Sequence, residues 1–212
     1  SIEDYIENAP LKSEAMYDGI LSLLEKEADK KNPLVQVAMR MYEENKAALL
    51  KWSAAKGVHH NCYGGLLYHT YRMMQAASKM LEVYPVTAEV LLPAVMLHDI
   101  GKLKELATDE LGIADYTEDG NLLGHTFIGL SMVNEMAAAL FGKEMDENTY
   151  EQIRQLKHAI ASHHGKMEWG AISIPATREA MLLHELDMVD SRLYQFEKVE
   201  EGLEPGMMSE RI

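Results

Sequence analysis

The chain has 212 residues, 47% of them hydrophobic, and a formal net charge of −14. This length and apolar content suffice for one substantial hydrophobic core, so a single domain is the default expectation. The negative charge repels phosphate backbones and argues against broad, non-specific nucleic-acid binding by this chain, although it leaves room for a local basic pocket.

Helical periodicity dominates the N-terminal half. Residues 11–30 place Leu, Met and Ile at spacings of three and four between Glu and Lys, which predicts an amphipathic helix. A second helix is expected to begin after an Asn32 cap, with Pro33 at its first position, and to end near Gly57. A third helix is expected over about 65–83, because a proline follows two residues later.

The central part of the chain carries the next helix and then a break. Thr87 is expected to cap the helix that contains His98 and Asp99, and Pro93 either kinks this helix or marks its start. The acidic, turn-rich segment 107–121 predicts an exposed loop with room for a short hairpin.

Three further helices are expected in the C-terminal half. They run over 122–141, 147–162 and, after an irregular stretch and a Thr177 cap, 178–200. No segment of the sequence predicts a multi-stranded sheet, and every long segment carries the helical period. The predicted fold class is therefore all-α.

The sequence also predicts how the chain is organised and where it resides. Residues 1–56 are expected to form an N-terminal helical segment packed on the core, residues 57–200 the main domain and residues 201–212 a C-terminal tail. The single cysteine, Cys62, fits a reducing compartment. The start, SIEDYIENAP, lacks the features of a signal peptide, and the longest apolar run, VLLPAVML, is far too short to span a membrane. We expect a soluble, cytoplasmic protein without a membrane partner, processed or cut from a longer chain.

Histidines carry the strongest chemical signal. Nine are present, and most fall at expected helix ends or loop junctions. A lone histidine is more often a structural or surface residue than a metal ligand. That interpretation weakens here because several histidines stand beside glycines and small residues, in YGGLLYHT, LLGHTFIG and SHHG, where the backbone can approach closely. The adjacent pair His98 and Asp99 adds to the argument, since burying either side chain without a partner costs several kcal/mol.

The order of these residues resembles that of a known superfamily. They form the pattern H…HD…H…H…D, made of His69, His98, Asp99, His125, His163 and Asp187. From about residue 57 to residue 192 the chain resembles the HD-domain superfamily of metal-dependent phosphohydrolases, and the full pattern resembles its two-metal members. The resemblance implies an HD-domain helical bundle, here with extra N-terminal helices, and a metal-dependent activity.

A closer resemblance is to the HD portion of the YhaM family of 3′–5′ exoribonucleases. It is carried by HHNCYGGLLYHT, MLHDIGKLKEL, GNLLGH, SHHGKMEWG and LLHELDMVDSR. That family has an oligonucleotide-binding (OB) barrel ahead of the HD domain, whereas the corresponding part of this chain predicts two helices. The expected substrate is therefore a phosphorylated small molecule or a short oligonucleotide, with an RNA-binding OB domain supplied by a longer chain or in trans.

The ligand set is expected to hold two divalent transition-metal ions. Two cations about 3.5–4 Å apart need a bridging ligand and several terminal ligands. A carboxylate can bridge, whereas an imidazole normally cannot, so Asp99 is the expected bridge. The remaining ligands divide between the ions as His69, His98 and Asp187 for one, and His125 and His163 for the other. Manganese, iron, nickel, cobalt or zinc would suit such a site, and magnesium is not excluded.

Other residues are assigned roles around these ligands. Lys102 stands one turn beyond His98, and in the superfamily this GK lysine is placed to meet substrate phosphate. His164 is left open between a metal ligand, a support for a ligand and a substrate contact. Asp190 lies three residues after Asp187, on the same helix face, and is a candidate to orient a ligand histidine.

Four residues are weaker candidates for substrate contacts. His60 precedes the first ligand helix and is as well suited to capping or the surface as to phosphate. Lys166 and Arg178 flank the last ligands and would add positive charge. Trp169 follows SHHGKME and could stack a base, although packing under the loop is the more common outcome.

The whole set favours a metal-dependent phosphohydrolase or phosphodiesterase acting on a nucleotide or oligonucleotide phosphoester. The cations, bridged by Asp99, would activate a water molecule. Lys102, with His164 or His60, would help neutralise the developing charge. Two alternatives remain: a di-iron oxygenase with the same ligands, and a nucleotide-sensing module with little turnover. Lys102 and the YhaM-like flanks favour hydrolysis, and the intact ligand set argues against a degenerate module.

Overall fold

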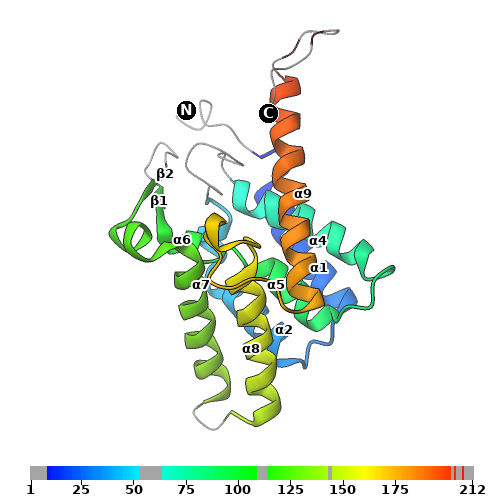
Figure 1. Ribbon diagram of the computed structural model, residues 1–212, viewed down its shortest axis with the longest axis vertical. Helices are drawn as coiled ribbons and strands as arrows, with labels where there is room; N and C mark the ends of the chain where they lie inside the picture. The colour runs from blue at the N-terminus through cyan, green and yellow to red at the C-terminus, as the bar shows by residue number, and fades with distance from the viewer. Residues whose placement is uncertain are drawn as a thin grey trace.

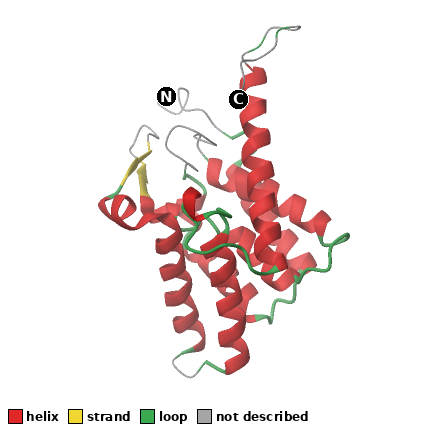
Figure 2. Ribbon diagram, viewed as in Figure 1, coloured by secondary structure: helices red, strands yellow, loops and turns green. Residues whose placement is uncertain are grey.

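The computed structural model describes residues 9–52, 64–108, 114–142, 145–201, 203 and 207. Within these ranges the chain is a helical bundle whose only strands form one short hairpin, so the predicted all-α class is confirmed (Figures 1 and 2). The elements are α1 Ser13–Glu27, α2 Pro33–Glu44, α3 Lys46–Leu49, α4 Gly65–Met80, α5 Ala88–Leu97, α6 Lys102–Glu105, β1 Leu106–Thr108, β2 Ala114–Tyr116, α7 Glu118–Phe141, α8 Glu147–Ser162, the 3₁₀ turn η2 Met167–Trp169, and α9 Arg178–Glu201.

The N-terminal helices are present but shorter than predicted, since α1 spans Ser13–Glu27 within the expected 11–30. Asn32 caps α2 by accepting a hydrogen bond from the backbone N–H of Leu34 at 2.8 Å, and Pro33 is its first residue. The second helix was expected to continue to Gly57, but it breaks at Asn45, whose backbone is not helical (φ −104°, ψ 10°). The one-turn α3 follows, and Gly57 lies outside the described residues.

Helix α5 ends immediately before the His98–Asp99 pair. Thr87 stands at its N-terminal cap without a side-chain capping bond, and Pro93 lies inside the helix rather than at its start. The expectation that this helix contains His98 and Asp99 is therefore wrong. Both residues lie in the turn to α6, which the backbone N–H of Lys102 closes by donating to the carbonyl of Asp99 at 3.0 Å.

The expected hairpin is present, and it leads into a kinked helix. Strands β1 and β2 pair antiparallel, with Leu106 opposite Tyr116. Thr117 caps α7 by accepting from the N–H of Gly120 at 2.9 Å, so the helix begins four residues before the expected start. Gly124 interrupts α7 with φ 71° and ψ 155°, a left-handed conformation that glycine adopts without penalty.

The core is continuous from the N-terminal helices to α9. Helix α5 is buried from Val90 to Leu97 and contacts α1, α2, α4, α8 and α9, which surround it (Figure 1). A helix that is apolar on all sides requires such a central position. Side chains of α1 and α2 belong to the same core cluster, whereas the predicted boundary near residue 56 lies outside the described residues. No helix in the described ranges is long and apolar enough to cross a membrane.

Candidate metal centre

Five parts of the chain converge at the C-terminal end of α5. They supply His69 from α4, His98 and Asp99 from the turn after α5, His125 from α7 just beyond its kink, His163 and His164 from the turn after α8, and Asp187 and Asp190 from α9. All six residues predicted as metal ligands are thus brought together, along with His164 and Asp190.

One group of ligand atoms surrounds His98. His69 Nε2 lies 3.3 Å from His98 Nε2 and 3.3 Å from Asp187 Oδ1. Asp99 Oδ2 lies 3.4 Å from His98 Nε2. Ligand atoms of His69, His98 and Asp99 all lie within 4.8 Å of one another, and the three side chains are buried. Three candidate ligands therefore converge on one place, with Asp187 next to His69.

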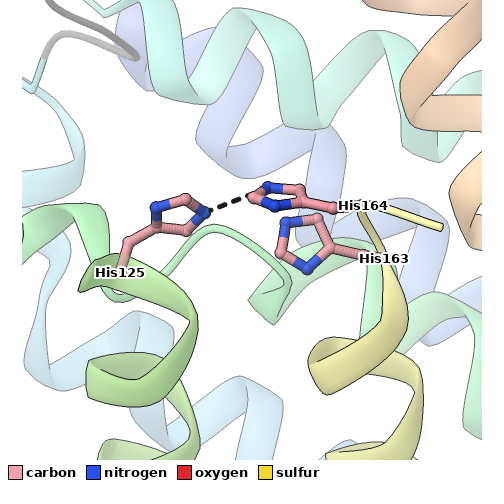
Figure 3. Close-up of side chains that lie close together, drawn as sticks. All are labelled: His125, His163 and His164. Carbon is pink, nitrogen blue, oxygen red and sulfur yellow. Dashed lines mark hydrogen bonds between the residues drawn. The ribbon is translucent and has the colours of Figure 1, made fainter. Parts of the chain in front are cut away.

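A second group consists of three histidines. Ligand atoms of His125, His163 and His164 lie within 4.8 Å of one another. Figure 3 shows the His125 and His164 rings facing each other across a contact of 3.3 Å between their Nε2 atoms, with the His163 ring beside them. The role of His164 was left open by the sequence, and the fold places its ring among the ligand candidates.

Asp99 lies between the two groups. Its Oδ1 atom is 3.4 Å from His125 Nε2 and 3.8 Å from His163 Nε2, whereas its Oδ2 atom faces His98. Each carboxylate oxygen is thus directed at a different group of histidines. Asp99 thus contacts both groups of histidines through one carboxylate.

Four of these imidazoles are held through Nδ1. The acceptors are Asp190 Oδ2 for His69 (2.7 Å), Val95 O for His98 (2.8 Å), Glu105 Oε1 for His125 (3.1 Å) and Ile160 O for His163 (2.6 Å). Because carbonyl and carboxylate oxygens only accept, Nδ1 carries the proton and Nε2 of the neutral ring presents a lone pair. Anchoring one ring nitrogen in this way orients the other toward a metal.

The donor set fits bound divalent metal ions. Buried His163 Nε2 has no hydrogen-bond partner among the described residues, although a buried polar atom normally has one. The 3.3 Å separation of His69 Nε2 and His98 Nε2 also fits. Two nitrogens that bind the same ion at about 2.0–2.1 Å lie roughly 3.3–3.4 Å apart in tetrahedral geometry.

The protonation states follow from burial and charge. Burial would raise the pKa of Asp99, but Lys102 and His98 outweigh it and hold this pKa well below its usual range. Burial lowers the pKa of His163 well below its usual range, which keeps the ring neutral. Burial opposes protonation of His69, yet hydrogen bonds to two aspartates raise its pKa to about 9. A cation that binds His69 Nε2 therefore displaces a proton.

The sequence analysis did not identify two residues that help to orient the histidine ligands. Glu105 accepts from both the backbone N–H (2.8 Å) and Nδ1 of His125. Arg72 donates through Nε to Asp190 Oδ1 at 2.7 Å. Arg72 leaves a faint trace in the sequence, since it stands three residues after His69 on one helix face, whereas Glu105, between Lys104 and Leu106, leaves none.

Of the two lysines predicted to contact substrate, Lys102 faces the ligands and Lys166 lies over Trp169. Lys102 Nζ donates to Asp99 Oδ2 at 2.7 Å, so it faces the ligands as expected. Lys166 Nζ lies 4.4 Å from the centre of the half-exposed Trp169 ring. The Lys166 ammonium thus makes a cation–π contact at the protein surface.

Two other candidates lie away from the ligands or outside the described residues. Arg178, at the start of α9, donates to the carbonyl of Pro85 at 3.3 Å and lines a surface cavity with Tyr84. It stands nine residues before Asp187, roughly 13 Å along the helix axis. The fold therefore does not bring Arg178 into the cluster. His60 lies outside the described residues.

The fold and the site together define the class of protein. The bundle brings the H…HD…H…H…D residues to one buried centre, and the family model described as the HD domain matches residues 66–192, more than half of the chain. The chain belongs to the HD domain family.

The curated relatives are longer than this chain. The 3′–5′ exoribonuclease YhaM of Bacillus subtilis (strain 168) is 35% identical over 214 residues, which cover 100% of this chain and 65% of the relative. YhaM of Bacillus velezensis is 34% identical with the same coverage, and YhaM of Shouchella clausii (strain KSM-K16) is 35% identical with 63% of its length covered. The chain thus spans just under two thirds of each relative. No solved structure matches the chain.

Proposed function

We propose that this chain is a metal-dependent phosphohydrolase that cleaves a phosphoester of a nucleotide or short oligonucleotide. The observation that carries the proposal is the pair of ligand groups on either side of Asp99. Membership of the HD domain family supports it, as do relatives named 3′–5′ exoribonucleases. Hydrolysis requires no residue beyond those in the cluster, since no serine or cysteine nucleophile is needed.

The proposed ligands follow the two groups. His69, His98 and Asp187 would hold one ion, and His125 and His163 the other, with Asp99 shared. His164 is proposed as a further ligand of the second ion, because its ring lies with His125 and His163. When bound, such cations lower the pKa of water toward neutrality and polarise phosphoryl oxygens. Manganese, iron, cobalt, nickel and zinc are all compatible with imidazole and carboxylate ligands.

The protein's own groups orient these ligands and bind the substrate. Asp190 and Glu105 fix two of the imidazole rings. The Lys102 ammonium has three N–H donors and uses one on Asp99. It can therefore keep this contact while donating to a phosphate oxygen. The walls of the site are mostly buried, which lowers the local dielectric and so strengthens that interaction.

The net charge limits the substrates of this chain alone. A protein with a formal net charge of −14 has little electrostatic attraction for a long phosphate backbone. We therefore propose small phosphodiesters and short oligonucleotides as its substrates. Long RNA would need an additional nucleic-acid surface, such as an OB domain in a longer chain or in trans.

Hydrolysis is expected to depend on metal and not on oxygen. Purified protein with Mn²⁺ should cleave bis(p-nitrophenyl) phosphate and a short single-stranded RNA under strict anaerobiosis. Chelation by EDTA should stop both reactions, and Mn²⁺ should restore them.

In ¹⁸O-labelled water the label should enter the phosphate product. Label arriving only from ¹⁸O₂ would instead favour the di-iron oxygenase, and full metal content without turnover would favour the sensing module.

Lys102→Ala is expected to keep its metal content and to lose about 10²–10³-fold in kcat, the usual effect of removing one preorganised charge contact. An ammonium has no lone pair for a cation, so Lys102 does not serve as a ligand. Metal content is measured by elemental analysis and kcat with a small phosphodiester. Lys104→Ala is the matched control, because Lys104 lies two residues away and is exposed. Loss of metal from Lys102→Ala would contradict the assignment.

A further inference from the structure

We propose that Arg72 is a positioning residue for the metal site, acting on the ligand His69 through Asp190, and that Glu197 holds Arg72 in place. The inference rests on the proposed function, because it concerns a proposed metal ligand. It assigns a role to two residues, one on α4 and one near the C-terminal end of α9, that touch neither the cluster of ligands nor the substrate.

The contact between α4 and α9 carries the argument. On α4, Arg72 follows His69 by three residues, so both side chains lie on one face. The facing side of α9 carries Asp187, Asp190 and Glu197, at spacings of three and seven, which return to the same helix face. One face of α9 therefore carries, in order, the proposed ligand Asp187, the buried Asp190 and the exposed Glu197.

Asp190 is shared between the ligand and the arginine. Its Oδ2 atom accepts from His69 Nδ1 at 2.7 Å, and its Oδ1 atom accepts from Arg72 Nε at 2.7 Å. The Asp190 residue is only 7% exposed. A carboxylate buried to this degree needs a charged partner, and breaking such a pair is strongly destabilising for the charge that remains. Arg72 supplies that partner while leaving Oδ2 directed at His69.

The other side of the guanidinium is fixed by Glu197. Arg72 donates through its NH1 atom to Glu197 Oε2 at 2.7 Å and through its NH2 atom to Oε1 at 3.1 Å. This is a two-point contact between the planar guanidinium and a carboxylate, which restricts rotation as well as position. Tyr68 adds an acceptor, its hydroxyl oxygen lying 3.3 Å from the NH1 atom. The orientation of the guanidinium is thus determined from several directions.

His69 is oriented by a side chain, Asp190, that is itself held by another side chain, Arg72. His98 and His163 donate Nδ1 to backbone carbonyls three residues earlier in their own chain segments. Those acceptors are positioned by local backbone structure. The acceptor for His69 is a side chain on another helix, and its rotamer is fixed by a third side chain. Losing Arg72 should therefore disturb His69, whose Nε2 must lie beside His98 Nε2 and Asp187 to bind the same ion. The positions of His125 and His163 should not change.

The test compares metal binding by the full chain and its Arg72 variants. Mn²⁺ stoichiometry and affinity are measured by competition with a chelating indicator. Arg72→Gln should weaken one of two bound ions by about 10–100-fold, the range seen when a partner of a ligand histidine is removed. Arg72→Lys should recover part of the affinity, because the ammonium restores a positive charge beside Asp190 but lacks the planar fork that binds Glu197 at two points. Arg40→Gln is the matched control, since Arg40 pairs with Glu43 and Glu44 on the exposed face of α2.

A spectroscopic readout separates positioning from general destabilisation. In the wild type loaded with diamagnetic Zn²⁺, the His69 Nδ1 proton should give a low-field imidazole resonance, identified by its absence from His69→Ala. Arg72→Gln should shift this resonance or broaden it by exchange, while Arg40→Gln should not. Glu197→Gln should change it in the same direction and less, since Arg72 keeps its contact with Asp190.

The outcomes distinguish this inference from the proposed function. If the wild type binds no metal, the proposed function fails and the inference fails with it. If the wild type binds two ions and Arg72→Gln binds both with unchanged affinity, only the inference is overturned. Should Arg72→Gln not fold, Arg72→Lys and Glu197→Gln decide, and wild-type affinity with an unshifted resonance in both would overturn it.

Discussion

Asp99→Asn is expected to remove most of the bound metal and to lower turnover by about 10³-fold or more. Asp99 directs one oxygen toward His98 and the other toward His125 and His163, so both groups of histidines share it. Asparagine keeps the shape but carries no negative charge, and its amide nitrogen is a donor that cannot bind a cation. Losing about 4 kcal/mol of transition-state stabilisation corresponds to roughly 10³-fold in rate.

The measurements are metal content by elemental analysis and kcat with a small phosphodiester. Asp18→Asn is the control, because Asp18 is exposed on α1 and lies far along the chain from the cluster. Far-ultraviolet circular dichroism should show that Asp99→Asn remains helical. If Asp99→Asn holds two ions as tightly as the wild type, Asp99 is not the ligand shared by the two groups.

Gly101→Ala is expected to lower the free energy of unfolding by about 3 kcal/mol, because the turn between α5 and α6 packs closely against α7. The backbone of Gly101 is ordinary (φ −62°, ψ −22°), so conformational strain is not the reason. A Cβ atom there would overlap the carbonyl oxygen of His125 and lie 2.7 Å from the backbone nitrogen of Gly129. Backbone atoms cannot rotate away, so α7 must move, and a ligand candidate moves with it.

Urea unfolding monitored by circular dichroism measures the effect, and Gly129→Ala is the matched control. Gly129 lies opposite Gly101 on α7, where a Cβ would be 3.4 Å from the Gly101 backbone nitrogen, an ordinary contact. Alanine also favours the helix over glycine by about 0.8–1 kcal/mol. Gly129→Ala should therefore be neutral or stabilising. Equal unfolding midpoints for Gly101→Ala and the wild type would contradict the close packing of the two segments.

Local chemistry explains which elements were predictable. Asn32 and Pro33 specify the start of α2, and Thr177 stands before α9, since caps and proline act on the neighbouring backbone alone. The break at Asn45 and the end of α5 before His98 carried no comparable local signal. Helical periodicity continues across both positions, and packing against other helices decides where each helix stops.

The sequence by itself determined that the protein is all-α and which residues form the chemical pattern. Periodicity is a local property, and the H…HD…H…H…D order can be read without knowing any distance. The tertiary structure decided that the six residues meet, that His164 joins them and that Asp99 lies between two groups. It also revealed Glu105, which holds a histidine 20 positions away, and Arg72, which holds an aspartate 118 positions away. Such contacts depend on how helices pack, and no local pattern of residues encodes them.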